Sequence, residues 1–242
     1  MLKPGVRSVP LTLFLWSIST VMLSRPIEVE VGRGRNWNAV KLVDQGQEQL
    51  FKGDLSGAHK SVDAAIQADP TYWPAYYIRA QVLIGERRYQ AAVQDCERIL
   101  RQDPTVVEAA LLRAQANFPL GRYGASLKEV QHCISIQPRQ DALARAYNTR
   151  ARLHLYCPDP SIRNGQAAVA DATTACKLMA WSDGELIDVL ATAEAATGNF
   201  DGAIRHEEQA MTAMKVREDE KKEYQRHLAL FQPHRALPGT MH

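Results

Sequence analysis

Residues 73–106 have the sequence WPAYYIRAQVLIGERRYQAAVQDCERILRQDPTV, and this stretch decides the fold. It contains two runs of helix-forming residues that meet at a polar turn around Arg87. The second run ends at Pro104, because a proline disfavours helix in the residue before it. Ala80 lies in the first run and Ala92 in the second. Helices whose axes are about 8–10 Å apart need small residues where they approach, so the stretch predicts an antiparallel pair packed through these alanines.

The landmarks of this stretch recur at a fixed spacing of 34 residues. The recurring sets are Pro70, Pro104 and Pro138, then Ala58, Ala92 and Ser126, then Gly46, Ala80 and Ala114. A period of this length indicates a solenoid of stacked helix pairs. We therefore predict three repeats without insertions, at residues 39–72, 73–106 and 107–140.

Two less regular repeats are expected at residues 144–180 and 184–214, which extends the array over residues 39–214. An extended turn with two prolines separates the two helices of the fourth repeat. The last repeat of a solenoid has an apolar face on which no further repeat packs. A helix with a polar outer side is therefore needed to cover that face. Residues 215–232 are therefore predicted to form a capping helix. The remaining stretches are a linker at residues 25–38 and a tail at residues 233–242.

These residues resemble the tetratricopeptide repeat family, bacterial type, over residues 39–214. Repeat two carries the family landmarks Tyr76, Ala80, Leu83, Tyr89, Ala92, Ile99 and Pro104. The resemblance implies an all-α fold, a right-handed α-solenoid of antiparallel helix pairs with about five units and a C-terminal capping helix. It also implies a scaffold that binds a peptide or helix of another protein in a concave groove lined by the first helix of each unit.

The resemblance further assigns positions to that groove, which we call the first-helix row. Its members are Val43, Gln47, Leu50, Tyr77, Gln81, Ile84, Leu111, Gln115, Phe118, Asn148, Arg152 and Leu155. The amides at matched positions would hydrogen-bond the backbone of an extended peptide, and the apolar members would contact its side chains. The alternative is that the row is only a shallow, solvent-compatible surface.

An arginine directly precedes the small residue of three successive first helices. These residues are Arg79, Arg113 and Arg150. They would either form a ladder that grips a ligand or lay their stems over neighbouring helices and pair with acidic residues there. We favour the second interpretation.

Composition and motifs argue against catalysis and against nucleic acid. The 242 residues carry a net charge of only +2, and basic residues are scattered among carboxylates. The chain has four cysteines but no CxxC pair, and His206 lacks a second histidine four residues later, so neither zinc pattern is present. We expect no enzyme, metal or cofactor. A remote alternative is an enzyme with a groove site around Arg152, His154 and Glu194.

The first 24 residues differ from the rest of the chain. Lys3 and Arg7 precede an uncharged, mostly apolar run at residues 8–23, which is typical of a signal peptide or a membrane anchor. The run predicts an exported, periplasmic or membrane-anchored protein that acts in assembly of an envelope complex. The alternatives are a cytoplasmic protein and an apolar tail that packs on the fold. Self-association into a regulatory or oligomeric module is the second functional hypothesis.

Overall fold

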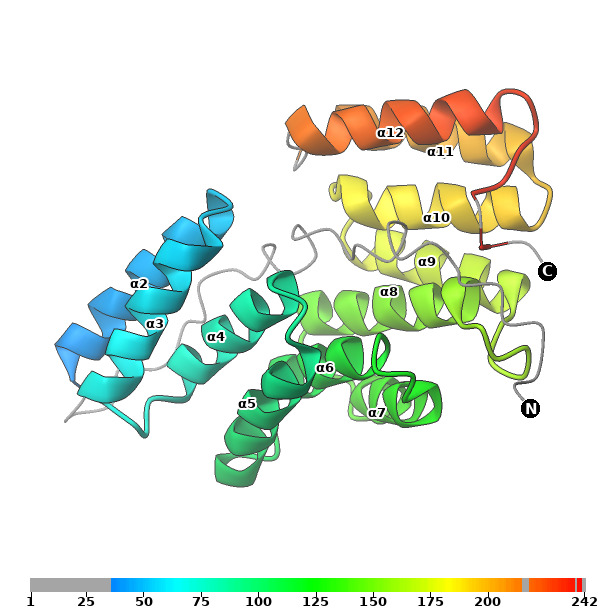
Figure 1. The fold of residues 1–242 in the computed structure, drawn as a ribbon. Helices are drawn as coiled ribbons and strands as arrows, with labels where there is room; N and C mark the ends of the chain where they lie inside the picture. Colours follow the sequence, from blue (N-terminus) through cyan, green and yellow to red (C-terminus); the bar gives the residue numbers. More distant parts are fainter. Residues whose placement is uncertain (1–35, 215–217, 238, 241–242) are drawn as a thin grey trace, which may run out of the picture. The chain divides into compact units, whose positions relative to one another are not determined.

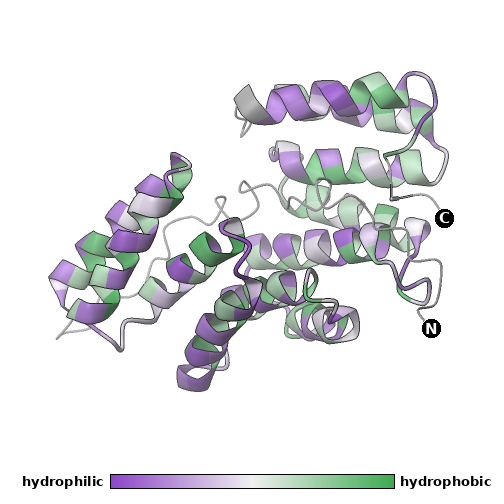
Figure 2. Cartoon of the chain, viewed as in Figure 1, coloured by the Kyte–Doolittle hydropathy of each residue, from purple (hydrophilic) through white to green (hydrophobic). Residues whose placement is uncertain are grey.

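The computed structural model describes residues 36–214, 218–237 and 239–240. These residues form eleven α-helices, α2 to α12, and no β-strand (Figure 1). Each helix carries both hydrophobic and hydrophilic residues, as amphipathic helices do (Figure 2). The all-α fold of consecutive helix pairs is therefore confirmed.

The helices belong to two compact units, and the chain passes from one to the other between Ile136 and Gln137. We call the described residues 36–136 the N-terminal unit and the described residues 137–240 the C-terminal unit. The boundary follows a local break in the chain: Gln137 has a positive φ of 48° and precedes Pro138, so no helix continues through it. The sequence predicted one uninterrupted array and did not reveal this division.

The N-terminal unit consists of three helix pairs. They are α2 (Trp37–Phe51) with α3 (Leu55–Ala68), α4 (Trp73–Gly85) with α5 (Tyr89–Gln102), and α6 (Val107–Asn117) with α7 (Tyr123–Ser135). Each helix packs on the next in the chain, and the first helices also contact each other, α2 with α4 and α4 with α6. The elements therefore stack in chain order.

The predicted small residues lie where the paired helices approach. Ala80 and Ala114 are completely buried. A Cβ added to Gly46 would lie 2.8 Å from Cγ1 of Val62 on the paired helix, too close for any side chain. Ser126 fills the matching place in α7, and its hydroxyl donates to the carbonyl oxygen of Ala114 at 2.6 Å. Close backbone approach, which the residue spacing predicted, therefore holds these pairs together.

The turn between paired helices requires a left-handed residue at one position. Gly53 and Gly121 occupy it with φ of 79° and 74°. Arg87 stands at the same position of the middle pair, with φ of 61°, although a side chain is disfavoured there. The turn geometry is thus imposed by the helix packing and tolerates a strained residue.

The C-terminal unit contains two helix pairs and a last helix. They are α8 (Gln140–Tyr156) with α9 (Gly165–Leu178), α10 (Gly184–Ala196) with α11 (Phe200–Thr212), and α12 (Glu218–Phe231). Helix α8 begins at Gln140, four residues before the predicted start at Ala144, because the chain can turn into helix soon after Pro138. Helix α12 packs on α11 and α10 and buries Tyr224 and Phe231.

The predicted signal or anchor segment, residues 1–24, lies outside the described residues. So does most of the predicted linker at residues 25–38. Within the part of the chain that the structure describes, no helix combines the length and the apolar character needed to cross a membrane.

Candidate functional site

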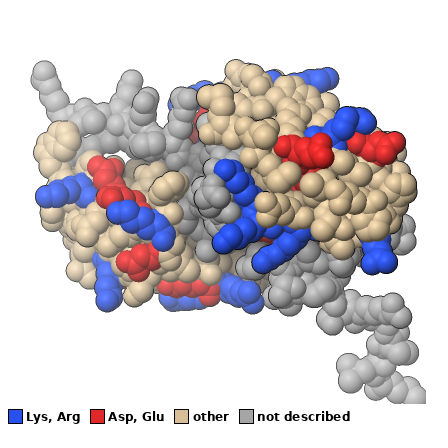
Figure 3. All heavy atoms as spheres, turned by 90° about the horizontal axis from the view of Figure 1, so that it is seen from above, with Lys and Arg blue, Asp and Glu red and all other residues tan. Residues whose placement is uncertain are grey.

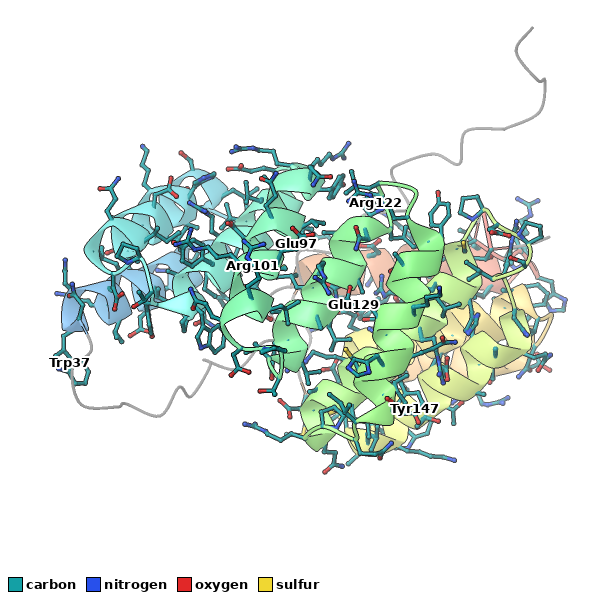
Figure 4. All side chains as sticks on the ribbon, turned by 90° about the horizontal axis from the view of Figure 1, so that it is seen from below. Trp37, Glu97, Arg101, Arg122, Glu129 and Tyr147 are labelled. Carbon is teal, nitrogen blue, oxygen red and sulfur yellow. The ribbon has the colours of Figure 1, made fainter. Side chains whose placement is uncertain are left out.

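The three arginines that precede the small residues each pair with a carboxylate. In the N-terminal unit, Arg79 donates from Nε and Nη2 to both oxygens of Asp95 at 2.8 and 2.7 Å. Its Nη1 also donates to Asp63 on α3 at 3.0 Å, so one guanidinium ties three consecutive helices. Arg113 donates to Glu129, which Figure 4 labels on α7.

Arg150 makes the equivalent pair in the C-terminal unit. It donates from Nε and Nη2 to Asp171 on α9, both at 2.7 Å. Its guanidinium also lies over the ring of Tyr147, 5.3 Å from the centroid. All three arginines therefore link the two helices of their own pair. This is the structural role that the sequence analysis favoured.

Most of the first-helix row is buried. In the N-terminal unit, seven of its nine members are buried and Gln47 and Ile84 are half-buried. The buried members are Val43, Leu50, Tyr77, Gln81, Leu111, Gln115 and Phe118. Val43, Leu50 and Tyr77 belong to the hydrophobic core of the N-terminal unit. These apolar residues therefore pack in the hydrophobic core of the chain. They also lie at the positions predicted for the groove.

In the C-terminal unit, the three row members on α8 are Asn148, Arg152 and Leu155, and all are buried. Arg152 donates from Nη2 to Oε1 of Glu185 at 3.0 Å, so its charge is balanced within the chain. Asn148 is 2% exposed, and its carbonyl oxygen Oδ1 has no hydrogen-bond partner. A buried polar atom without a partner is costly and calls for an explanation.

The polar row continues on α10, where sequence reasoning missed it. Asp188 and Thr192 lie 40 residues after Asn148 and Arg152, at the same places in the next first helix. Helix α8 contacts α10 directly. The alignment of Ala191 with Ala151 was the signal that could have found them, since it fixes the register of the fifth repeat against the fourth.

Asp188, which is half-buried, belongs to a cluster with the buried residues Glu207 of α11 and His227 of α12. Nδ1 of His227 donates to Oδ1 of Asp188 at 2.6 Å and lies 3.4 Å from Oε1 of Glu207. One ligand atom from each of the three residues lies within 4.8 Å of the other two. The Glu207 side chain is completely buried, which is unusual for a carboxyl group.

The electrostatics of the cluster follow from this geometry. Burial raises the pKa of Glu207 well above its usual value, and the neighbouring Asp188 carboxylate adds to the rise. Burial also opposes charge on Asp188, but the facing His227 outweighs it and lowers the pKa of Asp188. Burial likewise disfavours the imidazolium of His227, yet Asp188 raises its pKa to about 10. Burial therefore opposes charge on Glu207, whereas Asp188 and His227 each favour charge on the other.

The residues of the remote enzyme hypothesis have separate partners. His154 contacts the carbonyl oxygen of Ile162 through Nδ1 at 2.7 Å. Glu194 lies 2.6 Å from Nδ1 of His206 and accepts a hydrogen bond from Asn199. Arg152 pairs with Glu185, as described above. These contacts explain each side chain structurally.

All four cysteines, Cys96, Cys133, Cys157 and Cys176, are buried free thiols. Burial raises the pKa of Cys133 and of Cys176 to about 12. A thiol that stays protonated at neutral pH is a poor nucleophile. These cysteines are packing residues.

The sequence model of the tetratricopeptide repeat family matches residues 74–106, which form the α4–α5 pair and the turn after it. These residues are a tetratricopeptide repeat. Tetratricopeptide repeats generally serve as non-enzymatic scaffolds for protein–protein interaction, which is the broad function predicted from the resemblance.

Solved tetratricopeptide structures share the fold. A thermophilic tetratricopeptide protein of Thermus thermophilus has a TM-score of 0.69 and 14% identity, covering 81% of this chain and 99% of its own. Cut9, solved in an APC/C hetero-tetramer with Hcn1, has a TM-score of 0.66 and 17% identity, covering 81% of this chain and 36% of Cut9. MamA of Desulfovibrio magneticus has a TM-score of 0.52 and 17% identity, covering 73% and 95%. At these identities the likeness concerns the fold alone.

A curated tetratricopeptide relative matches a shorter region. The tetratricopeptide repeat and J domain-containing co-chaperone of Cryptococcus neoformans is 36% identical over 64 residues. This region is 26% of the present chain and 12% of the co-chaperone, so the match spans a small part of that protein.

Proposed function

We propose that this tetratricopeptide protein binds a peptide or helix of another protein along the first-helix row, and that the contact includes Asn148 and the neighbouring row residues of α8. The fold supports an interaction scaffold, and the row supplies the residue types that such a contact needs. The one observation that carries the proposal is the oxygen of Asn148, which is buried and has no hydrogen-bond partner.

An unpaired amide oxygen is suited to a backbone N–H of a bound peptide. A buried acceptor without a donor costs about 1–3 kcal/mol, which a ligand recovers by donating to it. Leu155 lies two helical turns after Asn148 and offers an apolar contact along the same helix. Because both side chains are buried in the chain by itself, binding requires a local rearrangement. We therefore expect association slower than the usual range of about 10⁵–10⁷ M⁻¹s⁻¹.

The partner is best identified by crosslinking pull-down from native cells, with mass spectrometry of the captured proteins. The bait is the full chain, compared with an Asn148→Ala variant. Gln209→Ala is the matched control, since Gln209 is an exposed amide on α11 outside the row. The proposal predicts a discrete protein whose capture falls at least about tenfold with Asn148→Ala only. Equal capture by all three baits would show that Asn148 is not part of the contact.

We also propose that residues 8–23 direct export or membrane attachment, which would place the scaffold with envelope complexes. The basic residues Lys3 and Arg7 ahead of an apolar run support this. Cell fractionation of the full chain and of a chain without residues 1–24 tests it. Export or membrane attachment predicts that only the full chain leaves the cytoplasmic fraction, and equal distribution of both would refute it.

Self-association is the second candidate function, favoured by two exposed aromatic residues on α2. Trp37 is 67% exposed and Phe51 is 59% exposed. Trp37 points away from the helices in Figure 4. The two residues are 14 positions apart, close to four helical turns, so both lie near the same side of α2. Light scattering on wild type and on a Trp37→Ala, Phe51→Ala double variant tests this; a dimer lost in the double variant supports it.

The expectation that the chain does not bind nucleic acid stays a prediction. On the face drawn in Figure 3, Lys and Arg side chains occur together with Asp and Glu side chains. A mixed surface of this kind is consistent with a protein partner and does not favour nucleic acid.

A further inference from the structure

We propose that Asp188, Glu207 and His227 form a binding site for a divalent transition-metal ion, with Zn²⁺ as the preferred ion, which joins α10, α11 and α12. The sequence alone predicts no metal, because the three residues are 19 and 20 positions apart and follow no short ligand motif. The structure brings them together from three different helices.

The ligand atoms have suitable chemistry and spacing. Zn²⁺ accepts imidazole nitrogen and carboxylate oxygen at about 2.0–2.2 Å, which places tetrahedral ligands about 3.3 Å from each other. Nδ1 of His227 lies 3.4 Å from Oε1 of Glu207 and 2.6 Å from Oδ1 of Asp188. Binding therefore needs the contact between Nδ1 of His227 and Oδ1 of Asp188 to lengthen by about 0.7 Å. The ligand atoms of all three residues already lie within 4.8 Å of one another, and a water molecule would be the fourth ligand.

Glu207 is the independent reason to expect an ion here. Its side chain is completely buried, and neither of its carboxyl oxygens accepts a hydrogen bond. The N–H at Nδ1 of His227 is already donated to Asp188 at 2.6 Å. A bound cation would give the Glu207 oxygens a partner, with Glu207 bound as a carboxylate and His227 bound through deprotonated Nδ1, and the displaced protons would pass to solvent.

The charges around the cluster permit a dication. Two carboxylates and a neutral imidazole give the site a charge of −2, which Zn²⁺ balances without leaving a net buried charge. The nearby cation Arg152 is paired with Glu185 at 3.0 Å. Glu220 and Tyr224 of α12 also face this region, and Tyr224 contributes a buried hydroxyl. On the outer side, Glu223 lies 4.0 Å from Nε2 of His227, where it can orient the ring.

A bound ion would stabilise the packing of the C-terminal capping helix, α12. One ligand comes from each of α10, α11 and α12, so a bound ion would fix the capping helix on the last repeat. An ion that binds only the folded state stabilises that state by mass action.

The test uses tag-free full chain, treated with a chelator, dialysed and titrated with ZnCl₂ in a calorimeter. The site predicts one Zn²⁺ per chain, and a melting temperature raised by about 5–10 °C at a hundredfold excess over Kd. Glu207→Gln removes a carboxylate ligand but keeps the size and shape of the side chain, so the apo variant should melt close to wild type. Its Zn²⁺ affinity should fall by more than about 100-fold.

The matched control is His206→Gln. His206 lies on α11 and pairs with Glu194 at 2.6 Å, which gives a second histidine–carboxylate contact outside the cluster. This variant should bind Zn²⁺ as wild type does. Circular dichroism of each variant checks that it is folded, and Asp188→Asn provides a second ligand variant if Glu207→Gln unfolds.

Cobalt identifies the ligands in the unmodified protein. Co²⁺ bound by nitrogen and oxygen gives a visible d–d spectrum without a strong thiolate charge-transfer band, whereas binding by a cysteine would give that band. The proposal is overturned if wild type does not bind Zn²⁺, if Glu207→Gln binds as tightly as wild type, or if the Co²⁺ spectrum shows thiolate ligation. The metal test is independent of the proposed partner binding, because the titration contains no other protein.

Discussion

Asp95 lies 16 residues after Arg79, and its carboxylate accepts hydrogen bonds from two nitrogens of that arginine, one on each oxygen. Arg113 and Glu129 have the same separation of 16 residues, and Nε and Nη2 of Arg113 both donate to Oε1 of Glu129. Each pair joins the first helix of a unit to the second, next to the small residue where the backbones approach. The α4–α5 and α6–α7 pairs are thus held by close packing through small residues together with an arginine–carboxylate ion pair.

Breaking the Arg79–Asp95 pair should destabilise the N-terminal unit. The Asp95 side chain is 9% exposed, so Arg79→Ala leaves a nearly buried carboxylate without its donors. We expect a loss of about 1–3 kcal/mol in the free energy of unfolding, measured by urea denaturation. Glu48→Ala removes the exposed Lys52–Glu48 pair and should change nothing measurable. Equal effects of the two substitutions would contradict the structural role of Arg79.

Replacing a small residue at the helix approach should be more damaging. Ala114 is completely buried and its carbonyl oxygen accepts from Ser126, so Ala114→Trp forces α6 and α7 apart. We expect a loss of about 3 kcal/mol or more, seen as a lower melting temperature. Ala125→Trp, at an exposed position of α7, is the size-matched control. An unchanged melting temperature for Ala114→Trp would mean that the helices do not pack there.

The strained turn offers a stabilising substitution. Arg87 is exposed and has φ of 61°, where Gly53 and Gly121 stand in the neighbouring pairs. Arg87→Gly should therefore stabilise the fold by about 0.5–1 kcal/mol in a denaturant titration. Gly121→Ala should destabilise it by about 1 kcal/mol through the backbone alone, since an added Cβ meets no atom within 4 Å. If Arg87→Gly and Gly121→Ala both stabilised the fold, the left-handed backbone would not be the reason for the glycine preference at this turn.

The buried thiols predict a dependence of stability on alkaline pH. The pKa of Cys133 and of Cys176 rises to about 12 in the folded chain, from 9.0 for a free thiol. The unfolded chain therefore loses these protons first, so stability falls as the pH rises from about 9 towards 12. Urea midpoints across this range measure the effect, and a Cys133→Ala, Cys176→Ala variant should show a weaker decline.

The same burial protects the thiols from modification. Iodoacetamide at about pH 8 should label native protein far more slowly than protein unfolded in urea, because only the thiolate reacts. Rapid labelling of Cys176 in the native state would show that the α8–α9–α10 core opens more readily than its packing implies.

The fold could be predicted because each helix pair has the same packing requirement and the same need for a helix stop. Every pair needs a small residue at the approach and a stop at its end, so Ala80, Ala114 and Pro104 have fixed spacing whatever the other residues are. The start of α8 was less certain, since several residues after Pro138 can adopt helix. The division at Gln137 was not predictable, because an array with even spacing gives no sign of where neighbouring units separate.

The candidate sites were predictable only in part. Family positions identified Asn148 and Arg152 but not that Asn148 lacks a partner, since that depends on which side chains surround it. The cluster of Asp188, Glu207 and His227 has no motif because its members come from three helices. Such a site depends on tertiary packing, and no local pattern records it.

The central claim is that first helices, rather than second helices, contact the partner protein. Hydrogen–deuterium exchange of the full chain, with and without the protein captured in the pull-down, tests it most directly. We predict slower exchange in peptides from α8 and α10 when the partner is bound, with little change in α9 and α11. Protection confined to α9 and α11, or to α2 around Trp37, would contradict the claim.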